Sequence, residues 1–323
     1  MDDFDPLMIR TYRISDTVIP SKLKAARGRL MPKIGRFKNE ASKQAYESIY
    51  RELEGTWPVP STQLDVPTSF GTTHVRRSGT GTETPIVLLH AVGANCLQWH
   101  IVIEDLCRDR VVYALDTIGT AGRSVQTAPL TGESDFATWV GEVLNELGVD
   151  RVHLVGYSHG AWHAVLVALH APERLASVTL IEPGGVFDKP SWRVLLKMIR
   201  AGMRHTDKNI RELNDWLSPG YVIGDREFAL VTEALNYRPG VGWARMLKDA
   251  EVQSISVPML VISGAETVVS SPEQVAARLA DLVPEAEVEI YAGTGHGILG
   301  HIPDRVIPRL MKFVRNHDDA KRT

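Results

Sequence analysis

The sequence predicts an α/β fold in which a mostly parallel β-sheet is flanked by helices. Short, nearly continuous apolar runs, typical of strands that are buried on both faces, occur five times. Four of these runs are followed by segments rich in helix formers, as the connections of a parallel sheet require. The five runs are residues 86–90, 111–116, 152–155, 178–182 and 259–263.

The third run leads directly into a G-x-S-x-G motif at residues 156–160, and a segment dense in helix formers continues from there to Pro172. A serine on a tight strand-to-helix turn is exposed above the sheet, with glycines where side chains would collide. Ser158 is therefore the candidate nucleophile. The backbone N–H of His159 stands at the start of the helix and is a candidate donor to an oxyanion.

The remaining elements are predicted from periodicity and composition. Residues 40–53 carry a helical apolar stripe that ends before the sequence Trp-Pro-Val-Pro at 57–60. Residues 69–76 are rich in β-formers and partly alternating, which predicts an antiparallel strand at an edge. Residues 287–291 alternate like an outer strand, and residues 303–314 predict a closing helix.

Helical patterns without strand signals fill the chain between the fourth and fifth runs. About seventy residues of helix exceed what a connection between neighbouring strands needs, which indicates an inserted cap. We therefore expect an N-terminal extension with one helix at 1–60, a core at 61–183 and 254–323, and a helical cap at 184–253. The helices expected in the cap are 191–203, 207–217, 226–235 and 243–249.

Composition and charge narrow the class of partner. With 323 residues and a formal net charge of -3, the chain has no overall attraction to nucleic acid or to an anionic membrane. Several basic residues lie within the first 36 positions, but without interleaved aromatic residues they favour a solvated leader over a polyanion-binding arm. We expect a monomer or homodimer that binds a hydrophobic small-molecule substrate.

Cysteine content and the first residues bear on the compartment. Cys96 and Cys107 are too few for a disulfide framework. The chain starts with acidic residues, and no apolar run approaches the length of a membrane span. These features favour a cytoplasmic protein. The sequence has no phosphate loop, dinucleotide motif or cluster of Cys and His ligands, so we expect no cofactor and no metal.

From about residue 40 onward the sequence resembles the α/β-hydrolase superfamily. Residues 88–93 resemble its H-G-x-G oxyanion loop, and residues 116–124 resemble its D-x-x-G-x-G-x-S loop. Ser158 occupies the position of the nucleophile elbow, and His296, in Gly-Thr-Gly-His-Gly, matches the catalytic histidine. Residues 57–60 together with 70–75 are similar to a bacterial subgroup of serine hydrolases. The resemblance implies an α/β-hydrolase fold with a helical cap.

The acid of the catalytic triad departs from this family pattern. Its usual position, the third residue after Gly264, is occupied by Thr267, which cannot stabilise an imidazolium as a carboxylate does. Glu182, at the end of the fourth run, stands where certain haloalkane dehalogenases of this fold carry the acid, and we favour it. Glu266 is the second choice, and a dyad without an acid is the third.

The oxyanion loop departs from the pattern as well. Ala91 replaces the family glycine, so a loop that needs a positive φ here would shift, although Gly93 offers freedom two residues on. The resemblance implies that the backbone N–H of Val92 is the second oxyanion donor, beside that of His159.

The leading hypothesis is a cofactor-free serine hydrolase that acts through an acyl-enzyme on an ester, lactone, thioester or related carbonyl of a hydrophobic or aromatic small molecule. A serine at position 158 argues against a dehalogenase or an epoxide hydrolase of this fold. A non-hydrolytic enzyme of a natural-product pathway, catalysing cyclisation, elimination or carbon–carbon bond formation, is one alternative. A ligand-binding protein with vestigial catalysis is the other. The expected pocket residues are Trp99, Tyr157, Trp162, Trp192 and Trp216.

Overall fold

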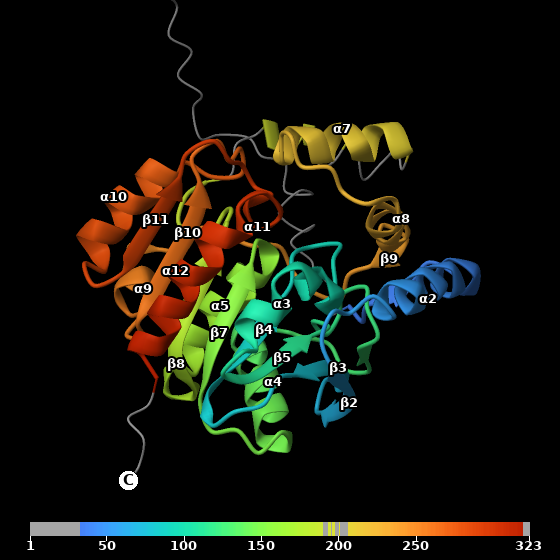
Figure 1. Ribbon diagram of the computed structural model, residues 1–323, viewed down its shortest axis with the longest axis horizontal. Helices are drawn as coiled ribbons and strands as arrows, with labels where there is room; N and C mark the ends of the chain where they lie inside the picture. Colours follow the sequence, from blue (N-terminus) through green and yellow to red (C-terminus); the bar gives the residue numbers. More distant parts are fainter. Residues whose placement is uncertain (1–32, 190–192, 195, 198–199, 201–205, 319–323) are drawn as a thin grey trace, which may run out of the picture. The chain divides into compact units, whose positions relative to one another are not determined.

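The computed structural model describes residues 33–189, 193–194, 196–197, 200 and 206–318. Within these ranges nine strands form one sheet in the order β11-β10-β8-β7-β4-β5-β3-β2, and β6 pairs with β3 (Figure 1). The strands are β2 (Ser61–Thr68), β3 (Gly71–Ser78), β4 (Glu83–Leu89), β5 (Arg110–Leu115), β6 (Val125–Gln126), β7 (Val152–Tyr157), β8 (Leu175–Ile181), β10 (Met259–Gly264) and β11 (Glu287–Tyr291).

The strands from β11 to β5 run parallel, and β3 and β2 complete the sheet in antiparallel orientation. All five apolar runs lie in this parallel part, as predicted. The reason for their continuous apolar character is visible in β4. Val87 and Leu89 belong to the hydrophobic cluster on one face of the sheet, whereas Ile86 and Leu88 belong to the cluster on the other face. Both faces are buried from Ile86 to Leu89, so every position of this part of the strand is apolar.

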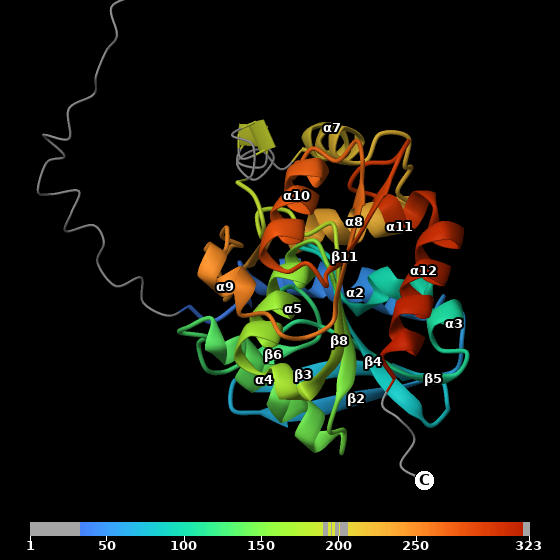
Figure 2. The same cartoon turned by 90° about the vertical axis from the view of Figure 1, so that its left-hand side faces the viewer.

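Helices cover both faces of the sheet (Figure 2). Buried residues of α4 (Ser134–Glu146), α5 (His159–His170), α9 (Asp249–Gln253) and α10 (Pro272–Leu282) belong to one hydrophobic cluster. Buried residues of α2 (Glu40–Glu54), α3 (Ile103–Leu106) and α12 (Pro303–Asn316) belong to the other. The predicted mostly parallel sheet with flanking helices is therefore confirmed. The remaining helical segments are η1 (Cys96–Ile101), η2 (Pro172–Arg174), α7 (Asp207–Leu217), α8 (Asp225–Ala234) and α11 (Ile298–His301).

The edge of the sheet differs from the prediction. Residues 69–76 contribute to β3, which is antiparallel as expected but lies between β2 and β5 rather than at the edge. The edge strand is β2, which the sequence did not reveal. Its run Ser-Thr-Gln-Leu-Asp-Val-Pro-Thr contains only two large apolar residues, and Val66 alone is buried. A strand that faces water over most of its length leaves a weak apolar pattern.

The segment between β8 and β10 contains α7 and α8 close to their predicted positions. The helix predicted at 191–203 lies largely outside the described residues. The helix predicted at 243–249 is wrong, because only α9 begins there, at Asp249, and the residues before it are irregular. The guanidinium of Arg245 pairs with Glu133 of the core and with Glu251, which holds this stretch in an extended path.

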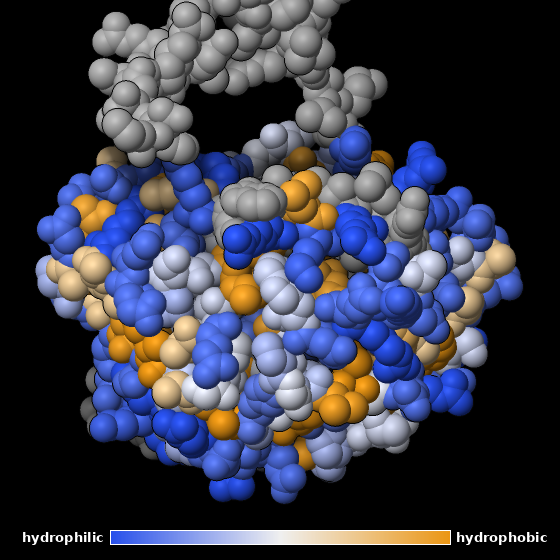
Figure 3. Space-filling view, turned by 90° about the horizontal axis from the view of Figure 1, so that it is seen from above, coloured by the Kyte–Doolittle hydropathy of each residue, from blue (hydrophilic) through white to orange (hydrophobic). Residues whose placement is uncertain are grey.

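Two contacts connect the segment between β8 and β10 to the segment that precedes the sheet. The two-residue strands β1 (Arg36–Phe37) and β9 (Tyr237–Arg238) pair antiparallel, and α2 packs against α8. Seen from the end where α7 lies, the surface is mostly hydrophilic with small separate apolar groups (Figure 3). None of the helices in the described ranges combines the length and the apolar character needed to cross a bilayer.

Candidate active site

The turn between β7 and α5 places Ser158 at the carboxyl edge of the sheet. Its backbone lies in the left-handed region, with φ 54° and ψ -114°, and its N–H donates to the carbonyl of Ile181 at 2.8 Å. The turn is possible only with glycines on both sides. A Cβ on Gly156 would lie 2.3 Å from the carbonyl oxygen of Gly160, and a Cβ on Gly160 would lie 2.2 Å from that of Leu89. This is the geometry of a nucleophile elbow.

His296 connects the serine to a carboxylate. Its Nε2 lies 3.0 Å from Ser158 Oγ, and its Nδ1 lies 3.2 Å from Glu182 Oε2. The three residues come from the ends of β7 and β8 and from the loop after β11. The structure thus brings together Ser158, His296 and Glu182, and it does not bring Glu266 to the histidine. The side chain of Glu266 is exposed to solvent, and no hydrogen bond joins it to His296.

Glu182 is fully buried, and its carboxylate is held by donors on both oxygens. Oε1 accepts the backbone N–H of Gly264 at 2.5 Å, and Oε2 accepts the hydroxyl of Thr267 at 2.7 Å. Its backbone, like that of Ser158, has a positive φ, here 53°. Thr267, the residue at the family's usual acid position, therefore donates a hydrogen bond to the acid. Sequence reasoning missed this role, since it asked only which residue could replace Thr267.

Helix α7 contacts the backbone of His296. The N–H of His296 donates to the carbonyl of Leu217, the last residue of α7, at 3.0 Å. On the other side, the hydroxyl of Tyr157 donates to the carbonyl of His296. The two rings are stacked, with 5.7 Å between their centroids and 22° between their planes. The loop that carries His296 is thus fixed both by α7 and by Tyr157, the last residue of β7.

The oxyanion loop after β4 is held by side chains that sequence reasoning did not single out. Ala91 donates its backbone N–H to Gln98 Oε1 at 2.9 Å. His90 Nε2 accepts the backbone N–H of Thr117 at 3.0 Å, so Nδ1 carries the proton and donates to the carbonyl of Ala91 at 2.8 Å. Burial lowers the pKa of His90, which keeps the ring neutral as this arrangement requires.

The expected strain at Ala91 is absent. Among the described residues, only Ser158 and Glu182 combine a positive φ with a side chain, and in this loop Gly93 supplies the positive φ, at 74°. The alanine is therefore accommodated without a shift caused by its own Cβ. Val92, the expected second donor, lies in this loop with 44% of its surface exposed.

The side chain of His159 is engaged away from the proton relay. Its Nε2 lies 2.9 Å from the carbonyl of Gly242, and its ring contacts His163 with 4.4 Å between centroids. Burial lowers the pKa of His159 to about 4, so the ring is neutral at pH 7. As the first residue of α5, His159 has a backbone N–H with no acceptor inside the helix, which is what an oxyanion donor needs.

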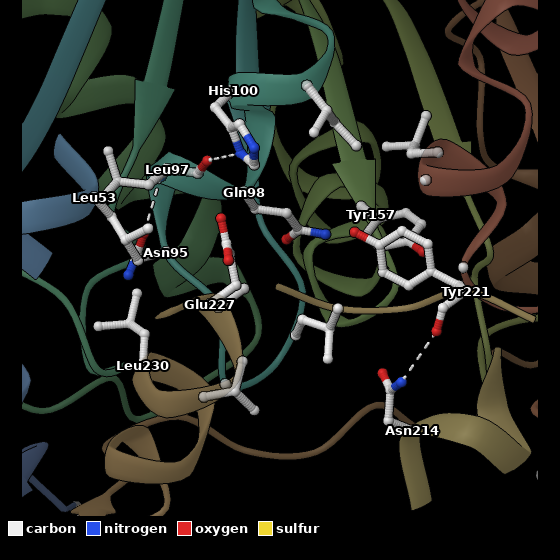
Figure 4. Close-up of a pocket in the computed structure, with 18 of the residues that line it drawn as sticks. Leu53, Asn95, Leu97, Gln98, His100, Tyr157, Asn214, Tyr221, Glu227 and Leu230 are labelled. Carbon is white, nitrogen blue, oxygen red and sulfur yellow. Dashed lines mark hydrogen bonds between the residues drawn. The ribbon is translucent and has the colours of Figure 1, made fainter. Parts of the chain in front are cut away.

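A cavity of about 210 Å³ lies beside the triad, and its wall includes Tyr157 and Gly297, the neighbours of Ser158 and His296 (Figure 4). Tyr157 was expected in the pocket. Trp99 and Trp162 were expected there too, but they do not line this cavity; their side chains, 0% and 3% exposed, belong to the two hydrophobic clusters. Trp216 is also absent from this wall, and Lys197 lies 4.7 Å from the centroid of its ring. Trp192 lies outside the described residues.

Trp99 supports the cavity indirectly, since its ring packs edge-on against Tyr157 at 6.5 Å. The sequence identified these tryptophans by their proximity to the elbow, and such proximity does not tell a wall residue from a core residue.

In the described part of the chain, no three His, Cys, Asp or Glu side chains are grouped to hold a metal ion.

Comparison with known proteins agrees with this geometry. A family model described as "alpha/beta hydrolase fold" matches residues 84–214, from β4 to α7. The crystal structure of naproxen esterase (carboxylesterase NP) from Bacillus subtilis superposes with a TM-score of 0.79 and 26% identity, over 85% of this chain and 99% of that one. The chain has the α/β-hydrolase fold.

The relatives of this α/β-hydrolase include curated carboxylesterases. One, named uncharacterized carboxylesterase nap, from Bacillus subtilis (strain 168), is 28% identical over 275 residues, which are 83% of this chain and 91% of the relative. Another from the same organism, carboxylesterase YbfK, is 26% identical over 83% of this chain and 93% of its own length. These full-length relationships support a hydrolase that acts on esters.

Proposed function

We propose that this α/β-hydrolase cleaves carboxylic esters of hydrophobic small molecules through an acyl-enzyme on Ser158. The observation that carries the proposal is the unbroken line of hydrogen bonds from Ser158 Oγ through His296 to the buried carboxylate of Glu182. A serine, a base and an orienting acid in this geometry are the parts that acyl transfer requires. The carboxylesterase relatives support the same bond class.

The reaction follows from the positions of these groups. Ser158 Oγ attacks the ester carbonyl while His296 Nε2 takes its proton, and the Glu182 carboxylate stabilises the imidazolium that forms. The N–H groups of His159 and Val92 receive the oxyanion. His296 then protonates the alcohol as it leaves. Water enters, loses a proton to His296 and attacks the acyl-enzyme, which releases the acid and restores Ser158.

The hydrophobic character of the substrate is proposed from the cavity wall. Leucine, isoleucine and valine residues from α2, η1, α8 and α11 form much of it. Such a wall binds alkyl or aryl groups by excluding water and leaves the few polar groups to set orientation. Lactones and thioesters present the same reacting carbonyl and fall within this proposal.

The non-hydrolytic and the receptor-like alternatives rest on Thr267 and Ala91. Both features have another explanation in this fold. Glu182 provides a carboxylate beside His296, and Gly93 takes the positive φ of the oxyanion loop. No other observation favours either alternative, so ester hydrolysis is the function the geometry supports best.

Hydrolysis of p-nitrophenyl heptanoate by the wild type and by Ser158→Ala tests the proposal. We expect the wild type to accumulate an acylated protein, visible by quenched-flow mass spectrometry, and Ser158→Ala to lose at least roughly 10⁴-fold in kcat. Ser177→Ala is a matched control. Ser177 Oγ also contacts a histidine, His153, at 2.8 Å, but it is only 1% exposed, so its replacement should leave kcat unchanged. Full activity of Ser158→Ala would refute the proposal.

A further inference from the structure

One wall of the cavity beside the triad carries an ionised side chain that the proposed reaction does not use. Glu227 is the third residue of α8, the helix that also contributes Leu230 and Val231 to this wall. In Figure 4 its carboxylate points into the cavity, between the side chains of Asn95 and Gln98 in this view. The side chain is partly buried, so its charge acts inside the cavity rather than only in bulk water.

No lysine or arginine of the described cavity wall is available to pair with Glu227. The described residues that line the cavity include no lysine and no arginine. His100 is the single histidine in the wall, and its Nδ1 lies 3.0 Å from the carbonyl of Leu97. Apart from Glu227 and His100, the described residues of the wall carry no carboxyl, ammonium, guanidinium or imidazole group.

The cations near this helix are engaged elsewhere. Arg226 pairs with Glu52 of α2 at 3.1 Å. Arg211 of α7 lies 3.4 Å from Asp225 and stands over the ring of Phe228, 3.9 Å from its centroid. None of the ion pairs in the described part of the chain involves Glu227. The two arginines nearest to it in sequence and in the facing helix thus have other carboxylate partners.

The negative field also reaches a neighbouring wall residue. Burial and then the charge of Glu227 raise the pKa of the Tyr221 hydroxyl. Tyr221 lines the same cavity as Tyr157, which contacts His296. The field of Glu227 is therefore present in the space that leads to the triad, and walls of low polarity strengthen such a field.

We propose that Glu227 makes this cavity selective for esters that carry a positively charged group, such as an alkylammonium, at the end remote from the reacting carbonyl. An ammonium group entering the cavity gains an ion pair with Glu227, while a second carboxylate is repelled. The inference rests on the proposed ester hydrolysis and adds a substrate class to it. Glu227 determines specificity and takes no part in the bond-breaking step.

Isosteric ester sets test this assignment. One set has p-nitrophenyl esters of heptanoic acid, 6-aminohexanoic acid and adipic acid, which end in a methyl, an ammonium and a carboxylate group. A second set places the charge on the alcohol side, with acetates of 1-heptanol and 6-aminohexanol. The measured quantity is the ratio of kcat/KM for the ammonium ester to that for the methyl ester. In at least one set, Glu227→Gln should lower this ratio roughly tenfold or more.

Two further variants sharpen the result. Glu227→Lys should reverse the order, so that the adipate ester becomes a better substrate than the 6-aminohexanoate ester. Asp225→Asn is the matched control, because Asp225 lies on the same helix but its side chain is 93% exposed. Its replacement should leave the ratio unchanged. An unchanged ratio in Glu227→Gln, while heptanoate is hydrolysed normally, overturns the assignment and leaves the proposed function intact.

Binding measured without turnover separates the proposed ester hydrolysis from the proposed preference for a cationic group. Calorimetric titration with heptylammonium and with 1-heptanol compares the same charge and chain without hydrolysis. Wild type should bind heptylammonium more tightly relative to 1-heptanol than Glu227→Gln does, by a similar factor. If no ester is hydrolysed but this difference in Kd is found, the proposed function fails and the cation preference stands. If the two proteins give the same Kd ratio, the cation preference fails.

Discussion

The carboxylate beside His296 comes from Glu182, whereas Thr267 occupies the usual position of the acid. At position 267 the family pattern has a carboxylate that accepts a hydrogen bond from histidine, and this chain has a threonine that donates one to Glu182. A buried carboxylate needs such donors, because burial without them favours the protonated form, which cannot stabilise an imidazolium. Thr267 and Gly264 together keep Glu182 ready to pair with His296.

Replacing Thr267 tests this positioning role. Thr267→Val removes the hydroxyl at nearly constant volume, and we expect kcat for p-nitrophenyl heptanoate to fall roughly tenfold with little change in KM, since a hydrogen bond to a charged group contributes about 1.5 kcal/mol or more. Thr267→Ser keeps the donor and should retain most of the activity. Equal kcat values in the valine and serine variants would contradict the role, as would a loss in both.

Strand β7, the elbow and helix α5 behave as one packed unit. The two glycines of the motif are fixed by approach distances, because α5 leaves no space for a Cβ against the strands beneath it. The packing of α5 against the strands imposes the positive φ of Ser158, which a serine rarely adopts by itself.

Gly160→Ala should therefore destabilise the fold by about 3 kcal/mol or more, measured as the free energy of unfolding in urea, because the new Cβ meets backbone that cannot move. Gly141 is a matched control within α4. A Cβ there meets only the end of the Arg174 side chain, at 4.0 Å, so Gly141→Ala should stabilise the protein by roughly 0.5–1 kcal/mol. A Gly160→Ala protein as stable as the wild type would contradict the packing account.

Most of the elements could be predicted from sequence wherever burial is complete on both faces. The runs that became β4, β5, β7, β8 and β10 are examples, since each of their positions is buried. The prediction was wrong where tertiary contacts decide. Strand β2 has few buried positions, and residues 243–248 follow ion pairs of Arg245 rather than their helical propensity.

The site shows the same division. Ser158 and His296 stand in motifs whose neighbouring glycines are readable in the chain. Between Glu182 and Glu266 the sequence could not decide, because the direction of a side chain at a loop depends on the backbone φ, which is positive at Glu182. Glu227 gave no signal, since the side of α8 that faces the cavity is set by packing against α2.

A buried cluster of polar residues lies where the parallel strands begin, at the end of the sheet away from Ser158. The side chain of Arg110 is fully buried and pairs with Asp318, just after α12, at 2.7 Å. Asp318 also accepts from His153 Nε2 at 3.1 Å, and His153 Nδ1 lies 2.8 Å from Ser177 Oγ. These contacts join β5, β7 and β8 to the end of the described chain. Ser177 is buried, so this serine–histidine–aspartate group resembles the triad in contacts but not in access.

Removing this carboxylate should affect the stability of the whole protein. Asp318→Ala leaves Arg110 with one carboxylate partner fewer in a buried position, so we expect a loss of about 3 kcal/mol in the free energy of unfolding in urea. Lys43→Ala, which breaks a pair that is about half exposed on both sides, should change it by less than about 0.5 kcal/mol. Similar stabilities of Asp318→Ala and Lys43→Ala would refute the role of Asp318.

The ion pair between Asp318 and Arg110 makes the free energy of unfolding depend on pH. Burial acts to raise the pKa of Asp318, but hydrogen bonds from Arg110 and His153 outweigh it, so the pKa lies below its ordinary value of 3.8. A carboxyl group with a lowered pKa in the folded state stabilises the fold above its unfolded pKa and loses that contribution as the pH falls through the folded value. The stability difference between wild type and Asp318→Ala should therefore be constant at neutral pH and shrink below about pH 3.8. A difference that grows on acidification would contradict this sign.

The central claim is that Glu182, from the end of β8, is the acid that activates Ser158 through His296. Labelling with a fluorophosphonate, read by intact-protein mass spectrometry, tests it most directly, because the rate reports the reactivity of the serine without a natural substrate. We expect stoichiometric labelling of wild type, none at the site in Ser158→Ala, a fall of roughly 10²-fold or more in Glu182→Gln, and no change in Glu266→Gln. Slow labelling in Glu266→Gln with a normal rate in Glu182→Gln would contradict the claim.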